Sequence, residues 1–400
     1  MSVEIIQGDS IEVLRTLPAD SVHCTVTSPP YWGLRDYGTG KWVGGDPECD
    51  HRSPTMREGR NEERRKVPGS AATNSAQNIL AHHSKCGRCG AVKIDQQLGL
   101  EPTLGEHLEA MVAVFEEVRR VLRPDGTLWL NYGDCYATAP NGRSAADTKA
   151  AGGDDRTFRD KPFSTIGPIG GKRHTAGISR EDVDVGGWGA SDDALRWRGG
   201  GVLKAKDLCM VPNRLAIALQ EAGWWVRSEI VWHKPNPMPE SIKDRPTTSH
   251  EKVWLLTKSE RYWYDADAVR EDAQGWNGSS FTSAQDVATK PGMGERQERP
   301  GRNLRNVWTI PTQPFSGAHF ATFPAELVER CIKAGCPVLG TVLDPFGGAG
   351  TTGLVADRLG RDALLIELNP DYCRMAEWRI AGDAPLFADV SCEAQAAGAA

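Results

Sequence analysis

The 400-residue sequence contains no apolar run approaching the length of a membrane-spanning helix, and its first residues show no signal-peptide pattern. It has no internal repeat and no excess of positive charge, because 53 acidic residues outnumber 47 lysines and arginines, for a net charge of −6. These absences argue against a membrane protein and against a uniformly basic nucleic-acid-binding protein. We expect a cytoplasmic protein with one large or two ordinary domains.

The ten cysteines lack the pattern of a secreted disulfide framework, but some of them predict a metal site. Cys49-x-His51 is followed by Cys86-x-x-Cys89, whose neighbouring glycines resemble those that let backbone amides point at sulfur in a zinc knuckle. Three thiolates and one imidazole commonly hold structural zinc. The predicted ligands are Cys49, His51, Cys86 and Cys89, with His82 or His83 as substitutes for His51. The alternative is an inserted loop with unliganded cysteines.

Near the other end of the chain, residues 341–345 predict a short buried strand, and Gly348-x-Gly350-x-x-Gly353 follows at once. Glycines let the backbone turn sharply and approach a ligand closely. A helix over 351–359 and a strand over 363–366 then lead to Glu367, in the place where an acid typically binds ribose hydroxyls. This succession predicts a nucleoside-cofactor site, and the alternative is a tight turn between packed elements.

A nicotinamide-dependent enzyme would share this succession. However, only residues 368–400 follow Glu367, with one predicted helix over 370–380. The rest of the sheet must therefore come from upstream sequence.

The N-terminal part begins with a predicted strand over 3–7, Gly8-Asp9, and a helix over 10–17 capped by Asp9 or Ser10. A second strand, 22–27, ends in Ser28-Pro29-Pro30-Tyr31-Trp32, which we expect at the carboxyl edge of a parallel sheet. The Ser28 hydroxyl and the Pro29 carbonyl can accept hydrogen bonds from an exocyclic NH2 group, and the two aromatic rings can stack on a base. A proline turn with two core aromatics is the alternative.

The two motifs together resemble those of amino-group DNA methyltransferases that use S-adenosylmethionine. The Ser-Pro-Pro-Tyr form is most similar to N4-cytosine enzymes, because adenine-N6 enzymes more often have an acid or asparagine in its first position. The catalytic motif precedes the cofactor motif, as in the permuted β class. The resemblance implies an α/β, Rossmann-like fold with a circularly permuted, mostly parallel seven-stranded sheet and an antiparallel hairpin strand.

The resemblance also implies the site residues. It places Ser28 and Gly348 on adjacent strand ends, and it assigns the catalytic motif to Ser28, Pro29, Pro30, Tyr31 and Trp32. The cofactor-binding residues that it implies are Asp9, Phe320, Thr322, Asp344, Pro345, Phe346, Gly347, Gly348, Gly350, Thr351, Thr352 and Glu367. C5-cytosine methylation is a poor alternative, because no cysteine lies in a Pro-Cys-Gln setting.

Polar stretches divide this predicted domain. Its catalytic part is expected in 1–32, 99–136 and 202–266, where 252–265 forms a hairpin, and its cofactor-binding part in 307–382. The other segments are the zinc-knuckle insertion 33–98, a glycine-rich insertion 137–201 that is disordered or contacts DNA, a candidate target-recognition segment 267–306, and a flexible tail 383–400.

The implied partner is double-stranded DNA, whose phosphates the basic stretches 57–66, 196–206 and 290–305 can contact. The implied reaction is direct methyl transfer to a flipped base in a prokaryotic cell or a phage-infected host. Cytosine N4 is favoured, and adenine N6 is the first alternative. RNA or a protein glutamine as substrate, and a non-catalytic DNA-binding protein, are weaker alternatives. A cognate restriction endonuclease is a candidate partner, and the sequence indicates no oligomeric state.

Overall fold

The fold was analysed in a computed structural model that describes residues 1–33, 39–51, 86, 88–95, 97–101, 103–137, 203, 206–272, 301–313, 323–383 and 389–394. Its centre is a nine-stranded sheet in the order β11-β1-β10-β9-β2-β5-β7-β6-β8. The strands are β1 (Ser2–Gln7), β2 (Val22–Thr27), β5 (Leu122–Tyr132), β6 (Trp225–His233), β7 (His250–Thr257), β8 (Val307–Thr309), β9 (Thr341–Asp344), β10 (Asp362–Glu367) and β11 (Asp389–Ala394).

The connectivity of this sheet confirms the predicted circular permutation. Strand β1 pairs in parallel with β10, and β9, which comes late in the chain, lies between β10 and β2. Strand β7 runs antiparallel to both β5 and β6, whereas every other pairing in this sheet is parallel. The fold is therefore the predicted Rossmann-like α/β fold with a single reversed strand.

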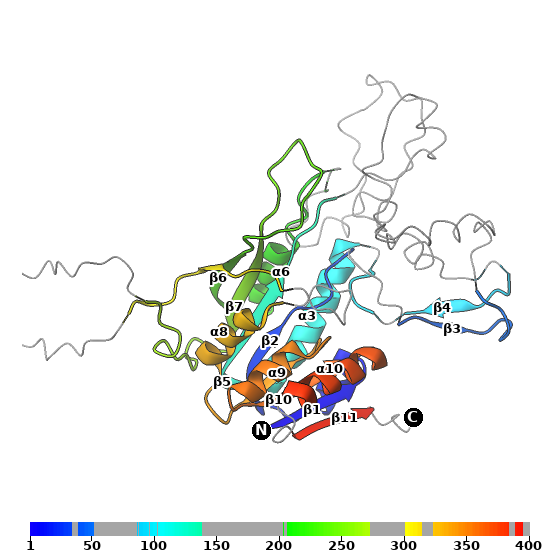
Figure 1. Ribbon diagram of the computed structural model, residues 1–400. Coiled ribbons are helices and arrows are strands. Elements are labelled where there is room, and N and C mark those ends of the chain that lie inside the picture. Colours follow the sequence, from blue (N-terminus) through cyan, green and yellow to red (C-terminus); the bar gives the residue numbers. More distant parts are fainter. Residues whose placement is uncertain are drawn as a thin grey trace, which may run out of the picture.

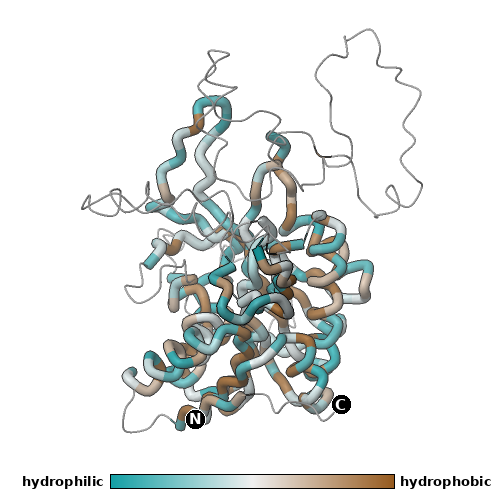
Figure 2. Tube along the Cα trace, turned by 90° about the vertical axis from the view of Figure 1, so that its right-hand side faces the viewer, coloured by the Kyte–Doolittle hydropathy of each residue, from teal (hydrophilic) through white to brown (hydrophobic). Residues whose placement is uncertain are grey.

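Helices cover both faces of the sheet (Figure 1). Helices α1 (Ser10–Thr16), α3 (Leu104–Val121) and α6 (Val211–Glu221) contribute to one hydrophobic cluster, and α8 (Ala325–Gly335), α9 (Thr351–Arg358) and α10 (Pro370–Asp383) contribute to another. Figure 2 shows hydrophobic residues concentrated in the body of the molecule and hydrophilic residues on its loops. The sheet is the middle layer of a three-layer structure, as expected when parallel strands are buried on both faces.

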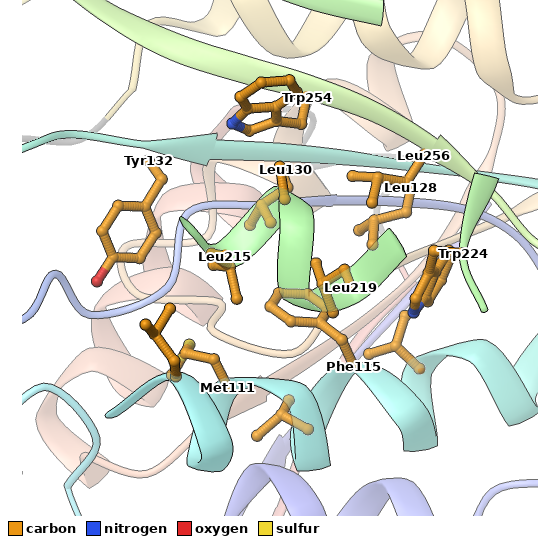
Figure 3. Packing of buried hydrophobic residues seen from close by; sticks show 14 of the residues in the cluster. Met111, Phe115, Leu128, Leu130, Tyr132, Leu215, Leu219, Trp224, Trp254 and Leu256 are labelled. Carbon is orange, nitrogen blue, oxygen red and sulfur yellow. The ribbon is translucent and has the colours of Figure 1, made fainter. Parts of the chain in front are cut away.

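Helix α3 illustrates how the sequence pattern builds one layer. The Thr103 hydroxyl caps it by accepting from the Glu106 amide at 3.2 Å. Its apolar residues recur at helical spacing, so that Met111 and Phe115 face the strands and the neighbouring helix α6 (Figure 3). Tyr132, at the end of β5, closes one end of this cluster and points its hydroxyl away from it (Figure 3).

The structure corrects three expectations. The sheet has two more strands than the predicted seven, because β8 and β11 extend its edges. Residues 389–394 of the expected flexible tail form β11 and pair along the whole of β1. The hairpin expected over 252–265 has only its first arm, β7. Beyond the turn, the Trp263 and Asp265 amides donate to the carbonyls of Asp125 and Ala334 instead of pairing with β7.

A separate ribbon lies outside the sheet (Figure 1). Strands β3 (Lys41–Val43) and β4 (Val92–Ile94) pair antiparallel, and the predicted zinc ligands lie in the segments that follow β3 and precede β4. Within the described part of the chain, no helix is both long and apolar enough to cross a membrane. The glycine-rich insertion and the middle of the candidate target-recognition segment lie outside the described residues.

Candidate active site and metal site

The two sequence motifs lie at the ends of neighbouring strands. Strands β2 and β9 pair in parallel through Cys24 with Val342 and Thr25 with Leu343, so the segments that follow them emerge at the same edge. Both threonine hydroxyls at this junction donate to Asp344, from Thr27 at 2.6 Å and from Thr352 at 2.7 Å. The predicted adjacency of the catalytic strand and the cofactor loop is confirmed.

Asp344 is the buried brace of this junction. Its side chain is 1% exposed, and it accepts two hydroxyl hydrogen bonds and the Phe346 amide at 3.1 Å. Burial raises the pKa of this carboxyl to about 6, although the three donors oppose the shift. Its carboxylate therefore holds the loop to β2, and a contact between Asp344 and the cofactor stays a prediction.

The cofactor loop turns through two glycines with left-handed backbone conformations. Gly348 has φ 50° and Gly350 has φ 75°, and Gly350 is the residue that precedes helix α9. The Gly348 amide donates to Glu367 Oε2 at 2.8 Å, and the Asn369 amide donates to Oε1 at 2.8 Å. Burial raises the pKa of Glu367 to about 7. Thus Glu367 lies directly against the loop, as the strand-loop-helix-strand pattern predicts.

Three strand ends converge beside Glu367. The Gly8 amide donates to the Glu367 carbonyl at 3.0 Å, and the Ser10 hydroxyl donates to the Pro345 carbonyl at 2.7 Å. Asp9 caps helix α1 through one oxygen, Oδ1, which accepts from the Ile11 and Glu12 amides. The predicted cofactor residues from β1, β9 and β10 are therefore brought to one edge of the sheet.

The remaining predicted cofactor residues differ in their accessibility. Thr351 and Thr352 are buried at 4% and 0% exposure, so they stabilise the start of α9 from inside. Gly347 donates its amide to the Ile366 carbonyl at 2.8 Å. Phe320 and Thr322 lie outside the described residues.

On the other side of the junction, Tyr31 belongs to a polar cluster. Its phenol oxygen lies 2.9 Å from Glu251 Oε2, 3.2 Å from Asn131 Oδ1 and 3.2 Å from the Ser28 hydroxyl. Its ring packs against Tyr132, with centroids 4.7 Å apart and a tilt of 32°. Burial, and after it the Glu251 charge, raise the pKa of the Tyr31 phenol well above its usual value.

Trp32 is a core residue in this structure, and its assignment as a base-stacking residue stays a prediction. Its side chain is 4% exposed, and its indole Nε1 donates to the Glu101 carbonyl at 3.0 Å. Its backbone amide donates to the Tyr132 hydroxyl at 2.8 Å. Of the two aromatic residues of the motif, Trp32 is the buried one and Tyr31 is half-buried, so Tyr31 is the stronger candidate for stacking on a base.

Sequence reasoning missed the residues that hold the motif from behind. His107 is fully buried, with Nδ1 2.8 Å from Glu101 Oε2 and Nε2 2.7 Å from the Tyr132 hydroxyl. Tyr132 in turn receives the Trp32 amide. This chain ties the start of α3 to the catalytic motif. Histidine at an otherwise apolar position of a helix stripe was the available signal.

The sequence did not assign Glu251, Asn131 or Lys234 to the site, although the segments around Lys234 and Glu251 resemble later sheet elements of the family. Lys234 Nζ forms an ion pair with Glu251, and the Asn131 amide donates to Glu251 Oε2 at 3.2 Å. These residues lie at the ends of β5 and β6 and at the start of β7, which share the edge occupied by Ser28. Polar residues at strand ends were the signal, but their register across the reversed strand could not be read from the sequence.

The predicted zinc ligands gather in the β3–β4 ribbon. One ligand atom from each of Cys49, His51, Cys86 and Cys89 lies within 4.8 Å of every other. The Cys49 and Cys86 sulfurs are 3.8 Å apart, and Cys89 Sγ is 3.4 Å from His51 Nδ1. Hydrogen bonding to the Cys89 backbone, followed by His51 and the Arg88 backbone, lowers the pKa of the Cys86 thiol to about 6. This donor set suits a tetrahedral metal ion.

The permuted sheet and the paired motifs define a methyltransferase of Rossmann-like fold. The sequence profile of the N6/N4 DNA methylase family matches residues 22–378, and the chain belongs to that family. It is 38% identical over 379 residues to the type II methyltransferase M.Cfr9I of Citrobacter freundii, covering 95% of this chain and 88% of that protein. It is 35% identical over 379 residues to M.SmaI of Serratia marcescens, covering 95% and 91%.

Among solved structures, the cytosine-N4-specific PvuII DNA methyltransferase aligns with a TM-score of 0.49 and 17% identity, covering 98% of this chain and 95% of that one. A putative DNA modification methylase of Thermus thermophilus, complexed with S-adenosylmethionine, aligns with a TM-score of 0.47 and 20% identity, covering 98% and 99%.

Proposed function

We propose that the protein transfers a methyl group from S-adenosylmethionine to the N4 amine of cytosine in duplex DNA. The observation that carries this proposal is the meeting of two motifs: Ser28 and Pro345 follow neighbouring parallel strands at one edge of the sheet. Membership of the DNA methylase family supplies the reaction class. An amine-accepting motif beside a nucleoside-binding loop is the arrangement that direct methyl transfer requires.

The cofactor is held by the loop and the three strand ends around it. Glu367 accepts hydrogen bonds from the ribose hydroxyls, and Asp9, which uses only Oδ1 to cap α1, binds the adenine end with its other oxygen. Glycines 348 and 350 let the backbone approach the nucleoside. Phe320 and Thr322 are proposed to line the methionine end.

The target base leaves the DNA stack at a cost of about a few kcal/mol and enters the pocket beside Tyr31. The Ser28 oxygen and the Pro29 carbonyl accept the two N–H bonds of the amine, so that its lone pair faces the methyl group. The nitrogen forms a bond to the methyl carbon while the bond between that carbon and sulfur breaks. The electron pair of the broken bond stays on sulfur, which becomes a neutral thioether. The cationic amine then releases one proton to water.

Serine in the first position of the motif supports cytosine. An acid or asparagine there is more usual in adenine-N6 enzymes, and Ser28 provides a neutral hydroxyl. The acceptor chemistry for the two amines is otherwise nearly the same, so identification of the methylated nucleoside decides between them.

Double-stranded DNA is the proposed partner despite the net charge of −6. Residues from the three polar segments 33–98, 137–201 and 267–306 are proposed to contact it. At the base of the last segment, Glu271 pairs with Arg302 at 2.9 Å and with Arg305 at 2.8 Å. These ion pairs join the two ends of the segment 267–306, so we expect its phosphate contacts to come from the residues between Glu271 and Arg302.

The proposed activity is tested with labelled S-adenosylmethionine and three substrates: duplex DNA, RNA and protein. We expect label in duplex DNA alone. Transfer into RNA or protein in preference to DNA contradicts the proposal, and binding to DNA without transfer to any of them supports a non-catalytic protein instead.

We also propose that methylation protects the target sites of a cognate restriction endonuclease, because the similar proteins M.Cfr9I and M.SmaI are type II methyltransferases. Methylation-aware sequencing of DNA from cells that express the protein gives the methylated sequence. DNA methylated at that sequence should resist an endonuclease that cleaves the same sequence. Cleavage of methylated and unmethylated DNA at equal rates would contradict the proposed protection.

We further propose structural zinc in the β3–β4 ribbon. A tetrahedral zinc ion with bonds of about 2.3 Å to sulfur and about 2.0 Å to nitrogen separates two sulfurs by about 3.8 Å, and sulfur from nitrogen by about 3.5 Å. The observed 3.8 Å and 3.4 Å match this geometry. Zinc would join the two ends of the segment between His51 and Cys86.

Elemental analysis of the purified protein tests this site, with one zinc ion per chain as the expected result. The double variant Cys86→Ser, Cys89→Ser should lose the metal, whereas Cys392→Ser, a half-buried cysteine in β11, should retain it. Absence of stoichiometric zinc from the unmodified protein contradicts the proposal.

A further inference from the structure

The Tyr31 hydroxyl is surrounded by more hydrogen-bonding oxygens than it has protons to donate. Glu251 Oε2 is nearest at 2.9 Å, and Asn131 Oδ1 and the Ser28 hydroxyl both lie at 3.2 Å. A phenol has one proton, and an ionised carboxylate only accepts. Because a hydrogen bond to a charged acceptor is the stronger one, the Tyr31 proton is donated to Glu251.

This choice fixes the role of Ser28. With the Tyr31 proton turned toward Glu251, the phenol oxygen accepts the hydrogen bond from the Ser28 hydroxyl at 3.2 Å. The Ser28 proton then points at Tyr31, and the Ser28 oxygen presents lone pairs to a donor on its other side. An exocyclic amine is such a donor. The opposite direction of the chain would aim the Tyr31 proton at Ser28 and occupy one of those lone pairs.

Glu251 is held by Asn131 of β5 and by Lys234, which directly follows β6. Its Oε1 is paired with Lys234 Nζ, and its Oε2 accepts from Asn131 Nδ2 at 3.2 Å as well as from Tyr31. The Lys234 and Glu251 side chains are only 17% and 18% exposed. Lys234 Nζ also lies 4.4 Å from the centre of the Trp232 ring, a cation–π contact that restricts it further.

We propose that Glu251 is a positioning residue for methyl transfer: by accepting the Tyr31 proton, it turns the Ser28 oxygen into an acceptor for the amine of the target base. The inference rests on the proposed function, because it assigns how the same pocket orients its substrate. Glu251 does not touch the base. It acts through Tyr31 and Ser28.

The electrostatics of the pocket agree with this direction of hydrogen bonding. Burial and the Glu251 charge both raise the pKa of Tyr31, so the phenol keeps its proton and remains a donor. The amine gains positive charge as the methyl group is transferred. The chain from Ser28 through Tyr31 to Glu251 therefore presents acceptor oxygens where positive charge develops, which favours the transition state.

The test compares Glu251→Gln with Tyr31→Phe, which keeps the ring and removes only the hydroxyl. Each single variant should lower kcat by about tenfold or more while the KM values for DNA and S-adenosylmethionine stay within about twofold. The double variant Glu251→Gln, Tyr31→Phe should have a kcat no lower than that of Tyr31→Phe alone, because both changes interrupt one chain of hydrogen bonds. Glu251→Asp, which keeps the charge, should retain more activity than Glu251→Gln.

Glu229→Gln is the matched control. Glu229 pairs with Lys252 at 2.7 Å on the same two strands, β6 and β7, and does not contact Tyr31. It should keep the unmodified kcat. Losses that multiply in the double variant, an effect on KM instead of kcat, or an equal loss in Glu229→Gln would overturn the inference.

Failure of the proposed function gives a different result. An unmodified protein that transfers no methyl group to DNA overturns the proposed function and this inference together. An active unmodified protein whose Glu251→Gln variant is equally active overturns the inference alone. If Glu251→Gln does not fold, the comparison of Glu251→Asp with Tyr31→Phe and their double variant gives the same test of additivity.

Discussion

The cofactor side and the base side of the site are held in different ways. On the cofactor side, Glu367 contacts Gly348 from 19 residues away, and Thr352 contacts Asp344 from 8 residues away. On the base side, Tyr31 contacts Asn131 from 100 residues away and Glu251 from 220 residues away. The cofactor side is built mainly on one strand-loop-helix-strand unit, to which Ser10 at the start of α1 is joined from 335 residues away. The base side exists only once four distant segments have assembled.

The difference has a consequence for how each side responds to substitution. A local unit is disturbed mainly by changes within it, whereas a pocket built from distant strand ends depends on the register of the whole sheet. Asp344 joins the two sides, because it accepts from Thr27 at the end of β2 and from Thr352 at the start of α9. Substitutions on each side, and at the joint between them, should therefore separate binding of the cofactor from transfer of its methyl group.

The largest effect is expected on the base side. The double variant Ser28→Ala, Tyr31→Ala removes both the proposed amine acceptor and the ring beside it, and should lower the rate of methyl transfer at least about 100-fold. Its affinity for S-adenosylmethionine should stay within about twofold of the unmodified value, as measured by calorimetry. Unchanged transfer would refute the assignment of this pocket.

Breaking the joint should affect both sides. In Asp344→Asn, an amide NH2 replaces one acceptor oxygen and faces a threonine hydroxyl that had been donating. We expect a loss of about 1–3 kcal/mol in the free energy of unfolding and about a tenfold lower transfer rate. Denaturant unfolding measures the first effect. Asp362 forms an exposed hydrogen bond to Ser2 on the neighbouring strand, and Asp362→Asn should lower the free energy of unfolding by no more than about 0.5 kcal/mol. An equal loss in Asp362→Asn and Asp344→Asn would contradict the bracing role of Asp344.

On the cofactor side, the raised pKa of Glu367, about 7, predicts a pH dependence. In the proposed binding mode the ribose hydroxyls donate to the ionised carboxylate. Cofactor affinity should then rise with pH, by about tenfold between pH 6 and pH 8 if only the ionised form binds. Calorimetry at both values measures this, and Glu367→Gln should abolish the dependence. An unmodified protein with equal affinity at both pH values would show that Glu367 does not take this role.

The raised pKa of Glu367 has the opposite consequence for stability: without cofactor, the free energy of unfolding should fall as the pH rises. Because the folded-state pKa of Glu367 lies above its unfolded value, the folded state binds more protons between about pH 4.5 and pH 7. The contribution of Glu367 to the free energy of unfolding is therefore fully present below about pH 4.5 and is lost as the pH rises to about 7. The Glu367→Gln variant should therefore show a flatter fall in melting temperature over this range.

The smallest effect on catalysis is expected at Trp32. Trp32→Phe removes the hydrogen bond to the Glu101 carbonyl and part of a buried ring, and should cost about 1–3 kcal/mol of stability. Its transfer rate at a temperature where it is folded should stay within about threefold. A loss of transfer as large as that of Tyr31→Phe would indicate that Trp32 contributes directly to binding the base.

The two sides also differ in how far the sequence predicts them. The strand-loop-helix-strand unit of the cofactor side is contiguous, so glycine spacing and the acid at Glu367 predicted its structure. The contribution of Asp9, which follows β1, came only from the family resemblance. The permutation followed from the order of the two motifs. The Glu251–Tyr31 contact could not be predicted, because it depends on the register of β7 against β5 and on a reversed strand direction. The two-aromatic motif alone likewise does not reveal that Trp32 is buried whereas Tyr31 is only half-buried.

The pocket beside the cofactor loop is proposed to methylate the N4 amine of cytosine. Duplex DNA treated with the protein and S-adenosylmethionine is digested to nucleosides and analysed by mass spectrometry, with the Ser28→Ala, Tyr31→Ala variant as the blank. We expect N4-methylcytosine from the unmodified protein and none from the variant. N6-methyladenine as the only product, or an equal yield from the variant, would contradict it.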